Sequence, residues 1–223
     1  MVKRILVLLL TIIFMVGVNG CMNLFPQSDE SIRDEILEHL NKKYDKEFVA
    51  LALDRGHTDI LLCYSQGENP ETNLVHAQRV TRDKDVEYKD TYFGIVMRNE
   101  IEAEIMSICS DVNLPIQVFY PSNDFYYDNM FDGTKTYTDF RQWITDGNTW
   151  RFDITIVLAL NDIADAEEYA NYVFEDLAEE NISLFTYLII LPSEGFEKVT
   201  RTNLNDILRQ YDGQTATLTK SIN

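Results

Sequence analysis

The sequence lacks the motifs by which many enzymes hold a metal ion, a phosphate group or a nucleophile. Its three histidines, His39, His57 and His76, do not pair at the spacing of a metal-binding helix. Glycine is scarce at nine residues, and none of them forms a phosphate-binding loop, a dinucleotide-binding pattern or a nucleophile elbow. We therefore predict no catalytic residues, no bound metal and no cofactor.

Positive charge is also scarce. Lysine and arginine number 19 against 37 aspartates and glutamates, which gives a formal net charge of −18 at pH 7. Nucleic-acid binding depends mainly on lysine and arginine contacts with phosphate, so the sequence argues against a nucleic-acid partner. The remaining composition, 45% hydrophobic and 25% charged, is typical of a folded globular protein. Its acidity fits a protein partner, a cationic peptide, a metal ion or simple solubility.

The N-terminus carries a short basic start, Lys3 and Arg4, followed by the apolar run Ile5 to Val16. This order is typical of a secretory signal peptide. A membrane-spanning helix needs roughly 20 apolar residues, and this run is shorter. We therefore predict a signal peptide over residues 1–20, with a permanent signal anchor as the alternative.

The end of this leader, Val18-Asn19-Gly20-Cys21, resembles the lipobox of bacterial lipoproteins, although Asn19 departs from the small residue usual at its position. The resemblance implies that Cys21 receives diacylglycerol and becomes the new N-terminus. Two acyl chains hold a soluble domain stably at a bilayer. The predicted location is therefore the extracytoplasmic face of the cell membrane, with the lipid as the contact with the membrane.

The rest of the chain predicts an α+β fold with a mainly antiparallel sheet and packed helices. Its organisation is either one domain or two lobes of similar size. The predicted parts are a short tether over residues 21–27, an N-terminal lobe over 28–121, an irregular connection rich in aromatic residues and aspartate over 122–149, and a C-terminal lobe over 150–223.

In the N-terminal half, apolar residues at helical spacing predict a helix from Ser28 to about Lys43, with a buried stripe of Ile32, Ile36, Leu40 and Tyr44. Three alternating runs separated by turn residues predict an antiparallel meander. These runs cover residues 47–54, 58–65 and 73–81. A loop or short strand over 86–92, a second helix carrying Ile101 and Ile105, and a strand over 116–120 follow.

In the C-terminal half, a short helix over residues 138–144 precedes a strand with strict apolar alternation from Phe152 to Leu160. Asn161 or Asp162 caps a long helix, and a second apolar strand covers 183–191. Strand, helix and strand predict a crossover with the two strands parallel or near neighbours. A helix over 203–211 and a strand over 215–221 complete the chain.

Two cysteines follow Cys21. Cys63 falls in an apolar strand and Cys109 on the apolar face of a helix, so both are predicted to be buried free thiols. A disulfide between them is the alternative in an oxidising compartment. A catalytic thiol is disfavoured because no basic partner is evident in the sequence.

One stretch, within the irregular connection, could hold a ligand. Its aspartates partly match a calcium-binding loop, but Met130 stands where an oxygen ligand belongs. Its aromatic residues could instead form a contact surface, as interfaces favour. The structural alternative is an ordered loop whose aromatic side chains pack inward while its aspartates face water. The candidate ligand-binding residues are Tyr126, Tyr127, Asp128, Phe131 and Asp132.

These patterns predict a non-enzymatic, lipid-anchored protein that binds a protein or a small ligand at the membrane surface. An envelope hydrolase that uses acidic residues is one alternative. A structural or protective envelope lipoprotein is another. A pocket with converging carboxylates would favour the hydrolase.

The anchor can be tested by expression in a lipoprotein-processing bacterium beside a Cys21→Ala variant. We expect an intact mass equal to the chain from Cys21 plus diacylglycerol, and loss of membrane association in the variant. Membrane fractionation and mass spectrometry measure both. An uncut chain that stays in the membrane without Cys21 would contradict the prediction.

Overall fold

A computed structural model describes most of the chain, and its fold is α+β with two four-stranded sheets. We call the sheet of β1 to β4 sheet A and the sheet of β5 to β8 sheet B. The described residues are 27–82, 85–122, 125–148, 151–180 and 183–222.

The predicted signal peptide and Cys21 lie outside the described residues. Within the described part of the chain, no helix is both long enough and apolar enough to cross a membrane.

Sheet A is an antiparallel meander whose strands lie in chain order. Its strands are β1 (Phe48–Asp54), β2 (Asp59–Ser65), β3 (Val75–Arg82) and β4 (Asp85–Asp90). Helix α2 (Asp29–Tyr44) packs on one face, and the Ser28 side chain caps its start by accepting from the Ser31 amide. The predicted stripe is buried at Ile32, Ile36, Leu40 and Tyr44. The predicted first helix and meander are confirmed.

Sheet B has the order β5-β6-β7-β8. Its strands are β5 (Ile116–Phe119), β6 (Phe152–Ala159), β7 (Leu184–Leu191) and β8 (Ala216–Ile222). β6 and β7 are parallel and are joined through α5 (Ala166–Glu179), whereas β5 and β8 pair antiparallel with their neighbours. The predicted crossover with parallel strands is therefore confirmed.

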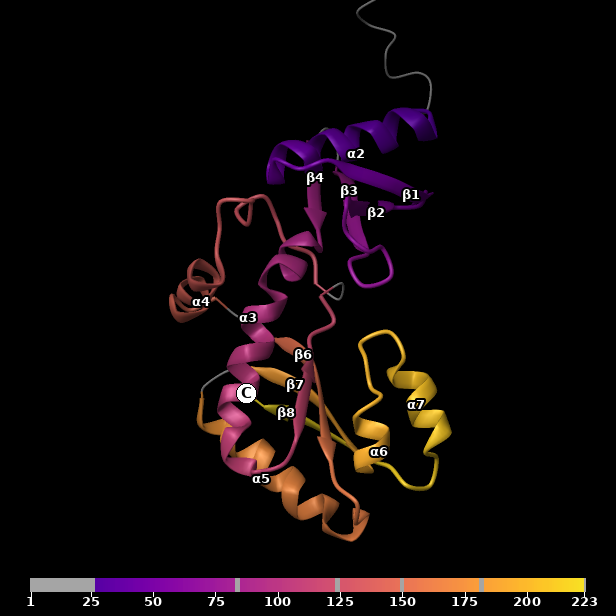
Figure 1. The fold of residues 1–223 in the computed structure, drawn as a ribbon. Helices are drawn as coiled ribbons and strands as arrows, with labels where there is room; N and C mark the ends of the chain where they lie inside the picture. Colours follow the sequence, from indigo (N-terminus) through magenta and orange to yellow (C-terminus); the bar gives the residue numbers. More distant parts are fainter. Residues whose placement is uncertain (1–26, 83–84, 123–124, 149–150, 181–182, 223) are drawn as a thin grey trace, which may run out of the picture.

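Helices lie on both faces of sheet B (Figure 1). α3 (Tyr92–Ile108) and α5 pack on one face, and α6 (Ser193–Phe196) lies with α7 (Leu204–Gln210) on the other. The short helix α6 was not predicted from the sequence. The long helix α5 begins later than predicted, because the Asp162 side chain caps the short turn η2 (Ile163–Asp165) instead. A second such turn, η1 (Cys109–Val112), follows α3.

One hydrophobic core runs through both sheets. Helix α3 extends from the end of sheet A along sheet B, and its Phe93 ring contacts rings from the segment predicted as an irregular connection. That segment contains α4 (Tyr137–Thr145) and contributes three of the buried rings, Tyr127, Phe131 and Phe140. It therefore helps to join the two sheets through a shared core.

A buried charge cluster fixes the segment to sheet A. Lys43 and Asp90 form an ion pair of 2.7 Å, and their side chains are only 3% and 2% exposed. Asp90 also accepts from the Tyr44 hydroxyl at 2.8 Å and from the Tyr92 amide at 2.9 Å. Lys43 donates to the backbone oxygen of Asp128 at 2.8 Å. The full set of partners compensates the cost of burying both charges.

Asp90 of the same cluster also holds the segment around Tyr127 beside the end of β4. The backbones of Asp90 and Tyr127 exchange two hydrogen bonds, of 3.0 and 2.6 Å, which form an isolated antiparallel bridge. Burial and the Asp90 carboxylate raise the pKa of Tyr44 well above its usual value, so its hydroxyl stays a neutral donor. The packing of the segment therefore depends on these charges.

An Asp90→Asn variant should be destabilised by about 3–5 kcal/mol, because it leaves Lys43 as an uncompensated buried charge. Denaturant unfolding followed by circular dichroism measures this free energy. Asp54→Asn, at an exposed position of β1, is the matched control and should stay within about 0.5 kcal/mol of the parent protein. Equal stability of the two variants would contradict the role given to Asp90.

Candidate functional site

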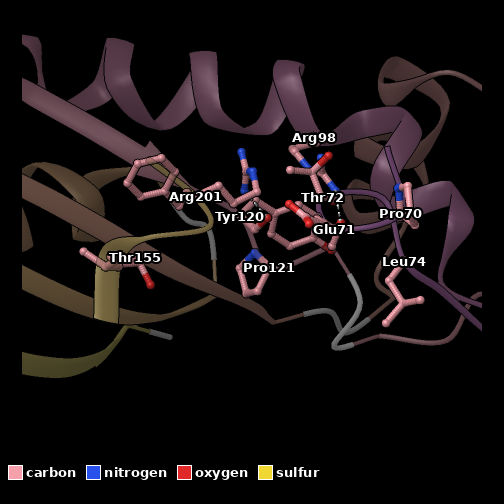
Figure 2. A pocket seen from close by; sticks show the side chains of 12 residues that line it. Pro70, Glu71, Thr72, Leu74, Arg98, Tyr120, Pro121, Thr155 and Arg201 are labelled. Carbon is pink, nitrogen blue, oxygen red and sulfur yellow. Dashed lines mark hydrogen bonds between the residues drawn. The ribbon is translucent and has the colours of Figure 1, made fainter. Parts of the chain in front are cut away.

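The site that we consider strongest is a cleft of about 430 Å³ where the two sheets meet (Figure 2). Its walls come from the loop between β2 and β3, from α3, from the end of β5, from β6 and from the loop after α6. Its size is within the range of small-molecule sites. The cleft thus brings together residues that are far apart in the sequence.

Arg98 of α3 lines this cleft and is only 9% exposed. Its guanidinium donates to neutral oxygens: Asn73 Oδ1 at 2.8 Å, the Thr72 carbonyl at 2.9 Å and the Ser122 hydroxyl. Among the described residues it forms no ion pair, and its Nε atom is buried without a hydrogen-bond partner. A buried charge is normally paired, so this arginine differs from the common pattern.

The electrostatic environment of Arg98 is unfavourable for its own charge. Burial lowers the pKa of Arg98, and the positive charge of Arg201 lowers it further. The carboxylates of Glu102 and Glu68 act in the opposite direction from a distance. An anion in the cleft would compensate the charge of Arg98 directly.

Arg201, the second arginine of the cleft, is paired. It donates to Glu102 Oε1 at 2.5 Å and to the Tyr120 carbonyl at 2.9 Å, and its guanidinium lies 5.4 Å from the centre of the Phe119 ring. The same Glu102 oxygen accepts from the Tyr120 amide at 2.8 Å. Figure 2 shows Tyr120 between the two arginines. The Glu102 carboxylate therefore holds Arg201 and the end of β5 in place.

Gly94 sets the position of the wall opposite Arg98. A Cβ atom at this residue would lie 2.7 Å from the Ser122 carbonyl oxygen and 3.3 Å from the Tyr127 ring. The absence of a side chain lets α3 approach this segment closely enough for Ser122 to reach the Arg98 guanidinium.

The structure places the candidate aromatic residues largely inside the protein. Tyr127 and Phe131 are 1% and 4% exposed, and Tyr126 is half-buried. Tyr127 packs against Phe93 and shares a hydrogen bond with the Tyr120 hydroxyl at 3.0 Å. The interpretation of Tyr127 and Phe131 as an exposed contact surface is therefore wrong, because their rings are buried in the hydrophobic core.

The aspartates of the same stretch make local hydrogen bonds. Asp128 accepts from the Met130 amide at 3.0 Å, and Asp132 accepts from the Thr134 amide at 2.9 Å. Bonds to Thr134 lower the pKa of Asp132. Among the described residues, no group of three potential metal ligands is present. The cleft contains none of the five candidate ligand-binding residues of this stretch.

The cysteines lie away from the cleft. Cys63 and Cys109 are free and buried, which confirms the prediction of buried thiols. Burial raises the pKa of each thiol to about 12, so neither is a ready nucleophile.

The sequence contained one signal for this site that our sequence analysis missed. Arg98 follows Gly94 by four residues and precedes Ile101 by three, so it lies on the buried face of its helix. A cation on such a face requires polar partners from elsewhere in the fold. Thr72, Ser122 and Arg201 could not be assigned to it, because the tertiary fold alone brings them near.

Comparison with models of known protein families, with curated proteins and with solved structures finds no match to this chain.

A Gly94→Ala variant should lose about 1–3 kcal/mol of stability, because the added methyl group meets a backbone oxygen that cannot move aside freely. Gly56→Ala is the matched control, since its Cβ atom would lie an ordinary 3.7 Å from the Thr58 backbone oxygen. Thermal unfolding of both variants measures the difference. A Gly94→Ala protein as stable as Gly56→Ala would contradict the close approach.

Proposed function

We propose that this protein is a lipid-anchored, extracytoplasmic binding protein whose cleft takes a small organic anion at the membrane surface. The observation that carries the proposal is Arg98, a buried guanidinium without an ionic partner among the described residues, at the wall of a small cleft. The membrane location rests on the leader that ends at Cys21.

The chemistry of the cleft favours binding of a carboxylate. A guanidinium carries five N–H donors, and the three hydrogen bonds of Arg98 leave part of this capacity unused. Hydrogen bonds between arginine and a carboxylate are charge-assisted and about twice as strong as neutral ones. The neutral oxygens that now hold Arg98 orient it without cancelling its charge.

The low dielectric around Arg98 is important because it strengthens local attraction of an anion, whereas the acidic chain as a whole repels anions. A net charge of −18 repels anions at long range, and this repulsion is screened by salt. A charge at Arg98, 9% exposed, is screened far less. Selective binding is therefore expected at this cleft, whereas the acidic outer surface binds anions poorly.

The cleft does not favour the hydrolase alternative. Glu102, a partly buried carboxylate behind the cleft wall, is held by Arg201 and by the Tyr120 amide. A general acid or base must be able to reach the reacting group of the substrate, and it must have a suitable pKa. The carboxylate at the wall, Glu71, is exposed to solvent. Glu102 thus helps to fix the shape of a binding site, and Glu71 lies at its rim.

The proposal is tested with acetate, propionate and inorganic phosphate as probes. The full-length expressed product, purified with detergent present, is titrated by calorimetry, and its thermal midpoint is followed in parallel. We expect the carboxylates to bind and to raise the midpoint, since a ligand at about 100 times its Kd stabilises by about 2.7 kcal/mol. Phosphate binding instead of carboxylate binding would overturn the carboxylate assignment.

Arg98→Met and Arg98→Lys should both weaken carboxylate binding by about 10-fold or more, because each removes the guanidinium donors. Arg98→Lys keeps the charge and protects the test against a failure of the methionine variant to fold. Arg209→Met, at an 82% exposed arginine side chain, is the matched control and should bind as the parent protein does. Unchanged binding in both Arg98 variants would contradict the proposed function.

A further inference from the structure

One face of sheet B is only half covered. At the end of β6 and β7 that α6 and α7 cover, Val157, Ile189 and Leu191 are buried in a small separate cluster. Toward the other end of the same face, Thr155 is partly exposed and Tyr187 keeps 42% of its surface exposed. Tyr187 lies in the middle of β7, which pairs with β6 on one side and with β8 on the other.

This open face continues directly from the cleft. Phe119 of β5 is the register partner of Thr155 in β6, and Thr155 is the partner of Tyr187 in β7. Phe119 and Thr155 both line the cleft. Neighbouring strands lie about 4.8 Å apart, so the Tyr187 ring stands one strand beyond the cleft wall.

The aromatic part of the face is ordered by its own packing. Phe185, two residues before Tyr187 and on the same face, holds its ring 4.9 Å from that of Tyr187 in an edge-to-face contact. The Phe185 ring has a second contact with the Arg151 guanidinium, which lies 5.6 Å from the centre of the ring. Two rings in mutual contact, one of them a single strand beyond the cleft wall, can hold a third ring in an offset or edge-to-face arrangement.

We propose that the ligand is an aromatic carboxylate. Its carboxylate lies in the cleft near Arg98, and its ring lies on the open face of sheet B against Tyr187. This inference deepens the proposed function and rests on it. Charge complementarity places the acidic end, and the row Phe119, Thr155 and Tyr187 sets the direction in which the body of the ligand extends.

The test compares acids that differ only in a ring. The probes are phenylacetate, 3-phenylpropionate and 5-phenylpentanoate, each beside the same acid without its phenyl group. Calorimetric titration of the full-length product should give about 3- to 10-fold tighter binding for at least one ring-bearing acid, the effect of a single aromatic contact. The chain length that gives the largest gain reports the spacing between Arg98 and Tyr187.

Two variants assign the effect. Tyr187→Thr removes the ring from an exposed strand position and should abolish the gain while leaving the ringless acids unchanged. Tyr172→Thr removes a tyrosine that is 47% exposed on α5, on the opposite face of sheet B, and should keep the gain. Threonine suits a strand, so the first variant is expected to fold.

The outcomes separate the inference from the proposed function. Equal binding of ring-bearing and ringless acids, with both lost in Arg98→Lys, would overturn the aromatic inference and leave the proposed function intact. A ring preference that persists in Tyr187→Thr would also overturn the inference. Carboxylate binding that does not depend on Arg98 would overturn both.

Discussion

The buried ion pair between Lys43 and Asp90 helps to hold sheet A and sheet B together, because it fixes the segment that follows β5 to sheet A. Asp90 ends the last strand of sheet A, and its backbone pairs with Tyr127 of the segment that returns from sheet B. Every oxygen of its side chain has a partner, from Lys43, Tyr44 or the Tyr92 amide. The aromatic core beneath this cluster can form because the charges above it are fully compensated.

Arg98 is also buried, but it has no carboxylate partner among the described residues. In the part of the chain that the structure describes, its partners are neutral oxygens, and its Nε–H donor has no partner. Asp90 compensates the buried charge of Lys43, whereas Arg98 carries a charge that has no ionic partner among the described residues. This contrast is the physical basis of the proposed anion site.

Local patterns in the sequence were sufficient for the elements but not for the site. The spacing of Ile32, Ile36 and Leu40 predicted α2, and strict alternation predicted the strand that follows residue 151, because these signals depend only on periodicity. The aromatic stretch was ambiguous, since a ring such as Phe131 suits a surface contact as well as a core. The cleft was not predictable, because its walls are far apart in the chain and Arg98 lies on the otherwise apolar buried face of its helix.

The proposed anion site is best tested by following the ¹⁵N-detected Nε–H resonance of Arg98, assigned through Arg98→Lys, during titration with propionate. This donor is unpartnered in the described protein. We expect its resonance to shift and saturate with the ligand, while that of the exposed Arg209 stays in place. An Arg98 resonance that does not move while propionate binds elsewhere would contradict the proposed anion site.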